Sequence, residues 1–150
     1  MAAGELQETR QSAGSRAYLS RRYRVSASHR LHSEAYSAEE NRAVYGKCNN
    51  PHGHGHNYAV EVTLGGPVDA GTGMVCDLGE LDAFARRNLL ERFDGMNLNT
   101  LEAFSEQVST TENIAIAIWR RLEGKVPGAR LHRVRVYERS DLFADYYGER

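Results

Sequence analysis

One stretch decides how this chain folds and what chemistry it carries: Cys48-Asn49-Asn50-Pro51-His52-Gly53-His54-Gly55-His56-Asn57-Tyr58. It holds one of the two cysteines and three of the six histidines, and it continues into an alternating apolar run that ends at Gly65-Gly66-Pro67. Alternation with a period of two predicts a strand over roughly residues 56–65. Imidazole and thiolate groups bind borderline metal ions and exchange protons near neutral pH, so the stretch indicates metal-assisted chemistry.

Strand geometry limits which histidines can share an ion. Side chains two residues apart point to one face, so His54 can converge with either His56 or His52. All three cannot converge, because about 3.3 Å per residue separates His52 from His56 by roughly 13 Å. We expect the third ligand to be His29, which ends an alternating run over 19–29 and would lie beside the pair if the two strands pair. Three histidines leave a fourth position open, as in catalytic zinc sites. The alternative is a solvated, glycine-rich loop whose histidines bind no metal.

Length and composition exclude several classes of protein. The 150 residues suit one domain, and 41% hydrophobic with 26% charged residues is ordinary for a globular chain. A net charge of -1 argues against nucleic-acid and membrane binding, so an anionic substrate would need a local basic patch. Residues 1–16 lack the apolar core of a signal peptide and are expected to form a disordered leader before a domain over 17–150. The expected location is the cytoplasm, where Cys48 and Cys76 stay free thiols.

Periodicity predicts strands over roughly 17–29, 56–65, 130–138 and 142–147, and helices over roughly 78–93 and 111–123. Asp77 and Glu80 form a capping-box pattern at the first helix, and Thr110 or Thr111 caps the second. The order β-β-α-α-β-β predicts an α+β fold with a four-stranded antiparallel sheet and two helices on one face. The long loop over 30–53 is expected to be functional and to contain a helical turn near Glu39. The other sheet face carries arginines with Tyr18 and Tyr137, which indicates contact with another subunit.

Four further residues offer chemistry, each with a simpler alternative. Cys48 is a candidate base or nucleophile beside a metal ion, or else an inert thiol. Glu138 ends an apolar strand face, where it either pairs with an arginine or contacts a ligand. Glu112 lies in the first turn of a helix, where the helix dipole alone explains it, and Asp94 beside Gly95 is explained by a turn.

Over roughly residues 17–147 the chain resembles the 6-pyruvoyltetrahydropterin synthase family and the related 6-carboxytetrahydropterin synthases of queuosine-precursor synthesis. The strongest matches are Ser26-Ala27-Ser28-His29-Arg30-Leu31 and the run from Gly46 to Tyr58. Ser109-Thr110-Thr111-Glu112-Asn113 and Val134-Arg135-Val136-Tyr137-Glu138 support them. The resemblance implies a tunnelling fold (T-fold) that assembles as a homohexamer of two trimers, with the site between subunits.

The resemblance also implies roles for single residues. Zinc would be held by His29, His54 and His56. Cys48 and Asp94 would be catalytic. Glu138 would anchor the pterin ring, in a pocket lined by Thr110, Thr111 and Glu112.

One position departs from the family pattern, because Asp94-Gly95 replaces the family's Asp-His pair. A positioned general acid or base is worth about 10²–10⁴-fold in rate, so the loss of this histidine bears directly on turnover. His52, on the loop of Cys48, or His132, from another strand or subunit, would be the candidates to replace it.

The implied activity is that of a zinc-dependent lyase acting on 7,8-dihydroneopterin triphosphate. Zinc would act as Lewis acid, the Cys48 thiolate would remove a proton, and loss of triphosphate would give 6-pyruvoyltetrahydropterin. Lys47 or Arg30 would hold the triphosphate. Two alternatives stay open: a 6-carboxytetrahydropterin synthase, and a catalytically degenerate pterin- or metal-binding homologue. The five-residue spacer between Cys48 and His54 resembles the pyruvoyl-forming enzymes more closely.

Overall fold

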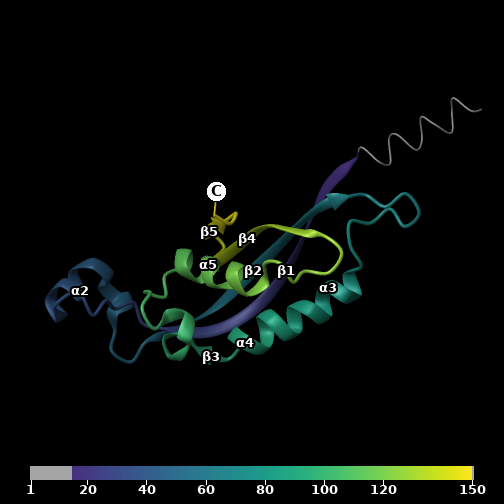
Figure 1. Cartoon of the computed structure of the whole chain (residues 1–150). Coiled ribbons are helices and arrows are strands. Elements are labelled where there is room, and N and C mark those ends of the chain that lie inside the picture. Colours follow the sequence, from purple (N-terminus) through teal and green to yellow (C-terminus); the bar gives the residue numbers. More distant parts are fainter. Residues whose placement is uncertain (1–14, 150) are drawn as a thin grey trace, which may run out of the picture.

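The computed structural model describes residues 15–149. Its centre is one five-stranded sheet in the order β3-β1-β2-β4-β5. Figure 1 shows β1 running along the length of the molecule, α3, α4 and α5 covering one face of the sheet, and α2 beyond one end. Residues 1–14 of the expected leader lie outside the described residues. Arg16 already belongs to β1, one residue earlier than predicted.

The strands β1 (Arg16–His29) and β2 (His54–Pro67) pair antiparallel over their whole length. Their inner faces alternate as the sequence predicts, with Val25 and Ala27 buried on β1 and Val60 and Val62 buried on β2. A one-residue slip would turn these side chains to solvent, so burial of one face fixes the register. In that register His29 lies opposite His54.

The C-terminal hairpin completes the antiparallel part of the sheet. β4 (Arg130–Arg139) pairs with β2, and β5 (Leu142–Tyr146) pairs with β4. Val134 and Val136 on β4 are fully buried and point to the same side as Glu138. This parity carries Glu138 towards the histidine end of β2.

The prediction of a four-stranded, purely antiparallel sheet is wrong in one detail. A fifth strand, β3 (Met96–Asn97), pairs parallel to β1 at Ala27 and Ser28. Two residues give no alternation to recognise, so the sequence pattern carries no signal for this strand. It forms because Gly95, at φ +74°, turns the chain and its N–H donates to the Ser26 carbonyl at 2.6 Å.

Both predicted helices are present. The first consists of α3 (Leu78–Ala85), a π-helical turn (Arg86–Leu90) and α4 (Glu91–Phe93), and the second is α5 (Thr111–Leu122). Asp77 caps α3 by accepting from Glu80 N at 2.9 Å. The helices pack apolar side chains onto the inner face of the sheet and form the core with it. These buried helix residues are Leu81, Phe84, Leu89, Ile114, Ile118 and Leu122.

The long loop after β1 is ordered by its own hydrogen bonds. It contains α2 (Ala38–Tyr45), with a reciprocal capping box between Ser37 and Glu40, and a 3-10 turn (Gly46–Asn49). Two further 3-10 turns, Leu98–Thr100 and Glu102–Phe104, lead into α5. The Cys48 carbonyl accepts from Leu31 N at 2.8 Å, which ties the cysteine turn to the end of β1.

The sheet face opposite the helices carries the predicted arginines, and most of them are ion-paired. Glu61 pairs with Arg22 and Arg133, and Asp145 accepts from Arg135 at 2.7 and 2.9 Å.

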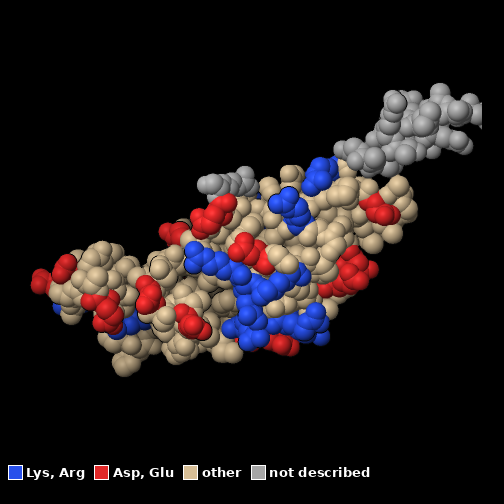
Figure 2. Space-filling view, viewed as in Figure 1, with Lys and Arg blue, Asp and Glu red and all other residues tan. Residues whose placement is uncertain are grey.

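Figure 2 shows the helix-covered face, where Lys and Arg form a band across the middle with acidic side chains around it. Although the net charge of the chain is only -1, basic side chains gather locally on this face. Within residues 15–149 no helix is long and apolar enough to cross a membrane.

Candidate metal centre

Three imidazoles meet where β1 ends and β2 begins. The ring centroids of His29, His54 and His56 lie 4.7, 5.2 and 4.8 Å apart in pairs. The Nε2 atoms of His29 and His54 are 3.1 Å apart. Two ligands held about 2.0–2.1 Å from a tetrahedral ion lie about 3.4 Å from one another, so this spacing suits one shared zinc ion.

A carboxylate joins the three histidines. His29, His54, His56 and Glu138 each offer one ligand atom, and these atoms lie within 4.8 Å of one another. Glu138 Oε1 is 2.9 Å from His56 Nε2. This contact does not have hydrogen-bond geometry. Among the described residues the buried His56 Nε2 makes no hydrogen bond. A buried nitrogen that makes no hydrogen bond is costly unless a metal ion uses its lone pair, and a carboxylate oxygen beside it is a further metal ligand, so the donor set fits a metal.

The protonation of His29 favours metal binding. Its Nδ1 donates to the Ser109 carbonyl at 2.7 Å, which leaves the Nε2 lone pair facing the other two rings. His29 is 2% exposed and Ser109 is fully buried. Burial lowers the pKa of His29 below its ordinary value of 6.5, and burial likewise lowers the pKa of His56. Both imidazoles are therefore neutral at neutral pH, the form that coordinates a metal ion.

The four residues expected to bind substrate separate into two pairs. Glu138 Oε2 accepts from the hydroxyl of buried Thr111 at 2.8 Å, so these two form one unit beside the histidines. Thr110 instead caps α5 by accepting from Asn113 N at 3.2 Å, and Glu112 is exposed in the first turn of that helix. Within this chain only the first pair is directed at the imidazoles.

Cys48 lies half-buried on the 3-10 turn that precedes β2. It is close enough to Tyr58 to act on its hydroxyl electrostatically: burial, Glu138 and then Cys48 raise the pKa of Tyr58. Tyr58 in turn places its hydroxyl 3.3 Å from His29 Nε2. This influence on Tyr58 is the contact that links Cys48 to the buried polar region, and the catalytic role expected of the thiol stays a prediction.

Two contributors to the site were missed from the sequence. The Ser109 carbonyl orients His29, but a backbone oxygen has no side-chain signature. Tyr58 shares the face of His54 and His56 by strand parity, and that parity was the available signal for its place beneath the rings.

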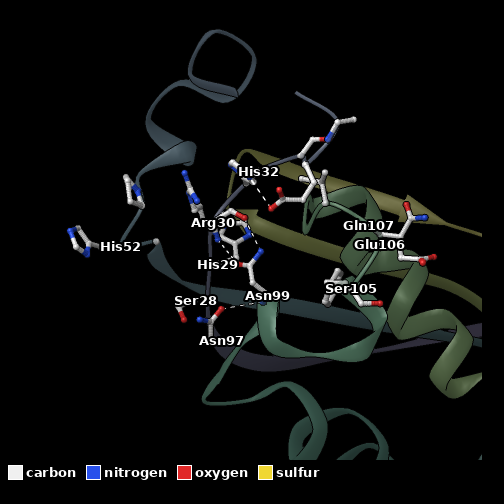
Figure 3. Close-up of a pocket in the computed structure, with 17 residues that line it drawn as sticks. Ser28, His29, Arg30, His32, His52, Asn97, Asn99, Ser105, Glu106 and Gln107 are labelled. Atoms are coloured by element: carbon white, nitrogen blue, oxygen red, sulfur yellow. Dashed lines mark hydrogen bonds and ion pairs between the residues drawn. The ribbon is translucent and has the colours of Figure 1, made fainter. Parts of the chain in front are cut away.

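A cavity of about 560 Å³ opens beside His29. Its walls come from the end of β1, the loop after it, the turn before β2 and the segment before α5. Figure 3 shows Arg30 and Asn99 next to His29 on its inner side. The cavity is large enough for a bicyclic ligand, and one of the three imidazoles lies in its wall.

With this geometry in place, comparisons identify the family. The family model described as 6-pyruvoyl tetrahydropterin synthase matches residues 18–149. A human protein named 6-pyruvoyl tetrahydrobiopterin synthase is 46% identical over 134 residues, which cover 89% of this chain and 92% of the human protein. The chain belongs to the 6-pyruvoyl tetrahydropterin synthase family.

Other relatives agree. The solved structure of Caenorhabditis elegans 6-pyruvoyl tetrahydropterin synthase superposes with a TM-score of 0.84 at 38% identity, covering 90% of this chain and 97% of that one. A putative 6-carboxy-5,6,7,8-tetrahydropterin synthase of Archaeoglobus fulgidus is 34% identical over 113 residues, covering 75% of this chain and 90% of the archaeal one. The expected T-fold and family are thus confirmed, and the pyruvoyl-forming relative is the more similar of the two named activities.

The family's Asp-His position, Asp94-Gly95, is bonded among the described residues to β1 and not to the imidazoles, although Gly95 and His56 line one shallow hollow. Asp94 Oδ1 accepts from Ser26 N at 2.8 Å, and Gly95 N donates to the Ser26 carbonyl. These two hydrogen bonds attach Asp94 and Gly95 to the edge of β1. The Asp94 side chain is exposed. Among residues 15–149 no hydrogen bond or ion pair links Asp94 to Cys48 or to the histidines.

Neither replacement histidine reaches the imidazoles within one chain. The ring of His132 contacts those of Tyr18 and Tyr147. It lies six residues before Glu138 on β4, which is about 20 Å along a strand. His52 is exposed on the turn before β2, and Figure 3 shows its ring directed away from His29. A compensating role for either residue would require a second chain or a movement of the turn.

Proposed function

We propose that this chain is a zinc-dependent 6-pyruvoyltetrahydropterin synthase, a lyase that converts 7,8-dihydroneopterin triphosphate to 6-pyruvoyltetrahydropterin with loss of triphosphate. The observation that carries the proposal is the meeting of His29, His54 and His56 around one point, with Glu138 beside them. The 46% identity to the human protein named for this activity supports the same substrate.

The three imidazoles would hold the zinc ion. A bound zinc ion would polarise the substrate's side-chain oxygens and make the adjacent C–H bond more acidic. The chain itself contributes neutral imidazoles, kept so by burial, and a fixed His29 tautomer. It also shields the inner part of the site from water, because His29 and Tyr58 are each 2% exposed.

Cys48 is proposed as the base that removes the substrate proton. A half-buried thiol, on the turn that leads into the histidine strand β2, is within the range of groups that perform this task. Glu138 is proposed to anchor the pterin, since a carboxylate accepts two parallel hydrogen bonds from a guanidine-like edge. The Thr111 hydroxyl would hold one carboxylate oxygen in place for this contact.

We propose that Asp94 acts across a subunit boundary in a homohexamer built from two trimers. Among residues 15–149 no hydrogen bond or ion pair joins Asp94 to the histidines, and its carboxylate is exposed, which supports a site completed by a second chain. Exposed aromatic side chains support an interface, since Tyr18 is 65% and Phe143 45% exposed. Sedimentation analysis tests the assembly. A cytoplasmic location is proposed as well, and the two unpaired cysteines agree with a reducing compartment.

The product decides the function. Purified protein is incubated with zinc and 7,8-dihydroneopterin triphosphate, and products are identified by mass. The pyruvoyl product with free triphosphate supports the proposal, whereas the carboxy product would assign the sister activity. The Cys48→Ser variant is the matched control and should lose at least about 100-fold in rate. Tight binding of zinc and pterin without product would identify a degenerate homologue, the alternative that Gly95 favours.

A further inference from the structure

The chain keeps the bonding pattern of a strand for two residues after β1 ends at His29. Both backbone groups of Arg30 bind the side chain of Asn99, which accepts from Arg30 N at 2.6 Å and donates to the Arg30 carbonyl at 2.9 Å. Both backbone groups of Leu31 are bound by residues 48 and 49 instead. Consecutive residues of a strand direct their N–H and C=O groups to opposite edges, so Arg30 and Leu31 extend β1 with a partner on each side.

The partner of Leu31 is the 3-10 turn Gly46–Asn49, which carries Cys48. Leu31 N donates to the Cys48 carbonyl at 2.8 Å, and the Asn49 side chain donates through Nδ2 to the Leu31 carbonyl at 2.7 Å. The Asn49 amide thus supplies the second bond that a neighbouring strand would make. Leu31 lies two residues beyond His29, about 6.6 Å along an extended chain. These two bonds therefore attach the backbone of Cys48 close to the end of the strand that carries His29.

Asn49 contacts three consecutive residues of this extension. Besides the bond to Leu31, its own carbonyl accepts from Arg30 Nε at 3.1 Å, and its Nδ2 lies 3.2 Å from His32 Nδ1. The Asn49 side chain is only 5% exposed, so water does not compete for its amide. Without that amide the Leu31 carbonyl would lose its partner, and the turn would be attached through two backbone carbonyls alone.

Given the proposed function, in which Cys48 is the base and zinc the metal ion, we propose that Asn49 is a positioning residue that fixes the Cys48 thiol relative to the three imidazoles. A general base must lie within hydrogen-bond reach of the proton it removes. A displacement of about 1 Å can cost 10²-fold in rate. The Asn49 amide prevents such a displacement, because it joins the turn of Cys48 to the strand that carries a zinc ligand.

The simpler alternative is that Asn49 stabilises the loop and has no bearing on the thiol. The same loop offers a matched residue for this role. Asn41 is fully buried, and its Nδ2 donates to the carbonyls of Ser33 at 2.9 Å and Ser37 at 3.0 Å. Asn41 therefore ties α2 to the loop after β1, and within residues 15–149 it forms no hydrogen bond to the turn of Cys48.

The test compares Asn49→Ala with Asn41→Ala, because each removes one buried asparagine amide from the same loop. Both variants should melt at a lower temperature than the wild type. The specific measurement is the pH midpoint for alkylation of Cys48, followed by mass in zinc-free and zinc-loaded protein. A thiol near a metal ion forms its thiolate at lower pH, so zinc should lower the midpoint by at least about 1 unit in the wild type and in Asn41→Ala. Asn49→Ala should lose most of this difference.

Turnover of dihydroneopterin triphosphate gives a second measurement. Asn49→Ala should lower kcat roughly 10- to 100-fold, while its zinc content and its affinity for phosphate-free dihydroneopterin stay those of the wild type. Asn49→Asp serves if the alanine variant does not fold. It keeps the size of the side chain but has no N–H for the Leu31 carbonyl, and it should show the same losses.

The outcomes separate this role from the proposed function. A zinc-induced shift or a kcat in the Asn49 variants equal to that of the wild type would overturn the positioning role, and so would equal loss of the shift in Asn41→Ala. A wild type whose Cys48 does not respond to zinc would overturn it as well. If the response is present and depends on Asn49, but no pyruvoyl product forms, the proposed function is overturned and the positioning role stands.

Discussion

Glu138→Gln separates the two roles that the geometry allows for this carboxylate. Oε1 lies 2.9 Å from His56 Nε2, where it could complete the coordination of a metal ion, while Thr111 holds Oε2 at 2.8 Å. A pterin edge would need both oxygens as acceptors. Glutamine keeps the shape and one acceptor, but it places an amide donor where the second acceptor was. The Thr111 hydroxyl still finds an oxygen, so the fold should be unaffected.

The expected loss follows from one charge-assisted hydrogen bond, worth about 1.5–3 kcal/mol. Pterin affinity should therefore fall roughly 10- to 150-fold, while one zinc ion per chain is retained on three imidazoles. Calorimetry with dihydroneopterin and elemental analysis of the same samples measure both quantities. Glu91→Gln, which removes the same charge from an exposed position on α4, should change neither. Undiminished pterin affinity in the folded, zinc-loaded Glu138 variant would refute the anchoring role, and loss of zinc would make Glu138 a ligand.

The other predictions concern α5, the missing histidine and pH. Thr110→Ala should cost about 1 kcal/mol of stability through the lost cap, with little change in pterin affinity, whereas Thr111→Val should weaken pterin binding; melting curves and calorimetry compare them. Gly95→His meets no steric obstacle, because an added Cβ has no neighbour within 4 Å, although φ +74° costs about 1 kcal/mol. The variant should raise turnover if the family histidine is needed, and an unchanged rate would show that it is dispensable. Metal-free protein should lose stability as pH falls from about 7 towards 5, since the unfolded chain takes up protons near 6.5 that His29 and His56 resist. Denaturant titrations at several pH values test this, and a flat profile would contradict it.

The arrangement of the three histidines was predictable because strand parity is strict. The period of two placed His54 and His56 on the apolar face of β2, and burial of that face left one register with β1. In that register His29, at the end of β1, lies opposite His54. The fold class follows from the same patterns, since the two helices and four of the strands carry clear periodicities.

The features that the sequence did not predict depend on tertiary contacts. The strand β3 has two residues and exists because the turn at Gly95 meets the edge of β1. The Ser109 carbonyl orients His29 across eighty positions of sequence, and no residue pattern encodes such a contact. The hydrogen bond from Ser26 N to Asp94 is likewise a tertiary contact, whereas the local sequence around Asp94 predicts only a turn.

The most direct test of the account is the zinc content of purified protein, compared with that of His54→Ala and of His132→Ala. His54 is half-exposed at the start of β2, so its removal should leave the fold intact, and His132 is a histidine at the far end of the sheet. We predict about one zinc ion per chain in the wild type and in His132→Ala, and a marked loss in His54→Ala. A wild type that binds no stoichiometric metal, or a His54→Ala variant that retains it fully, would contradict the account.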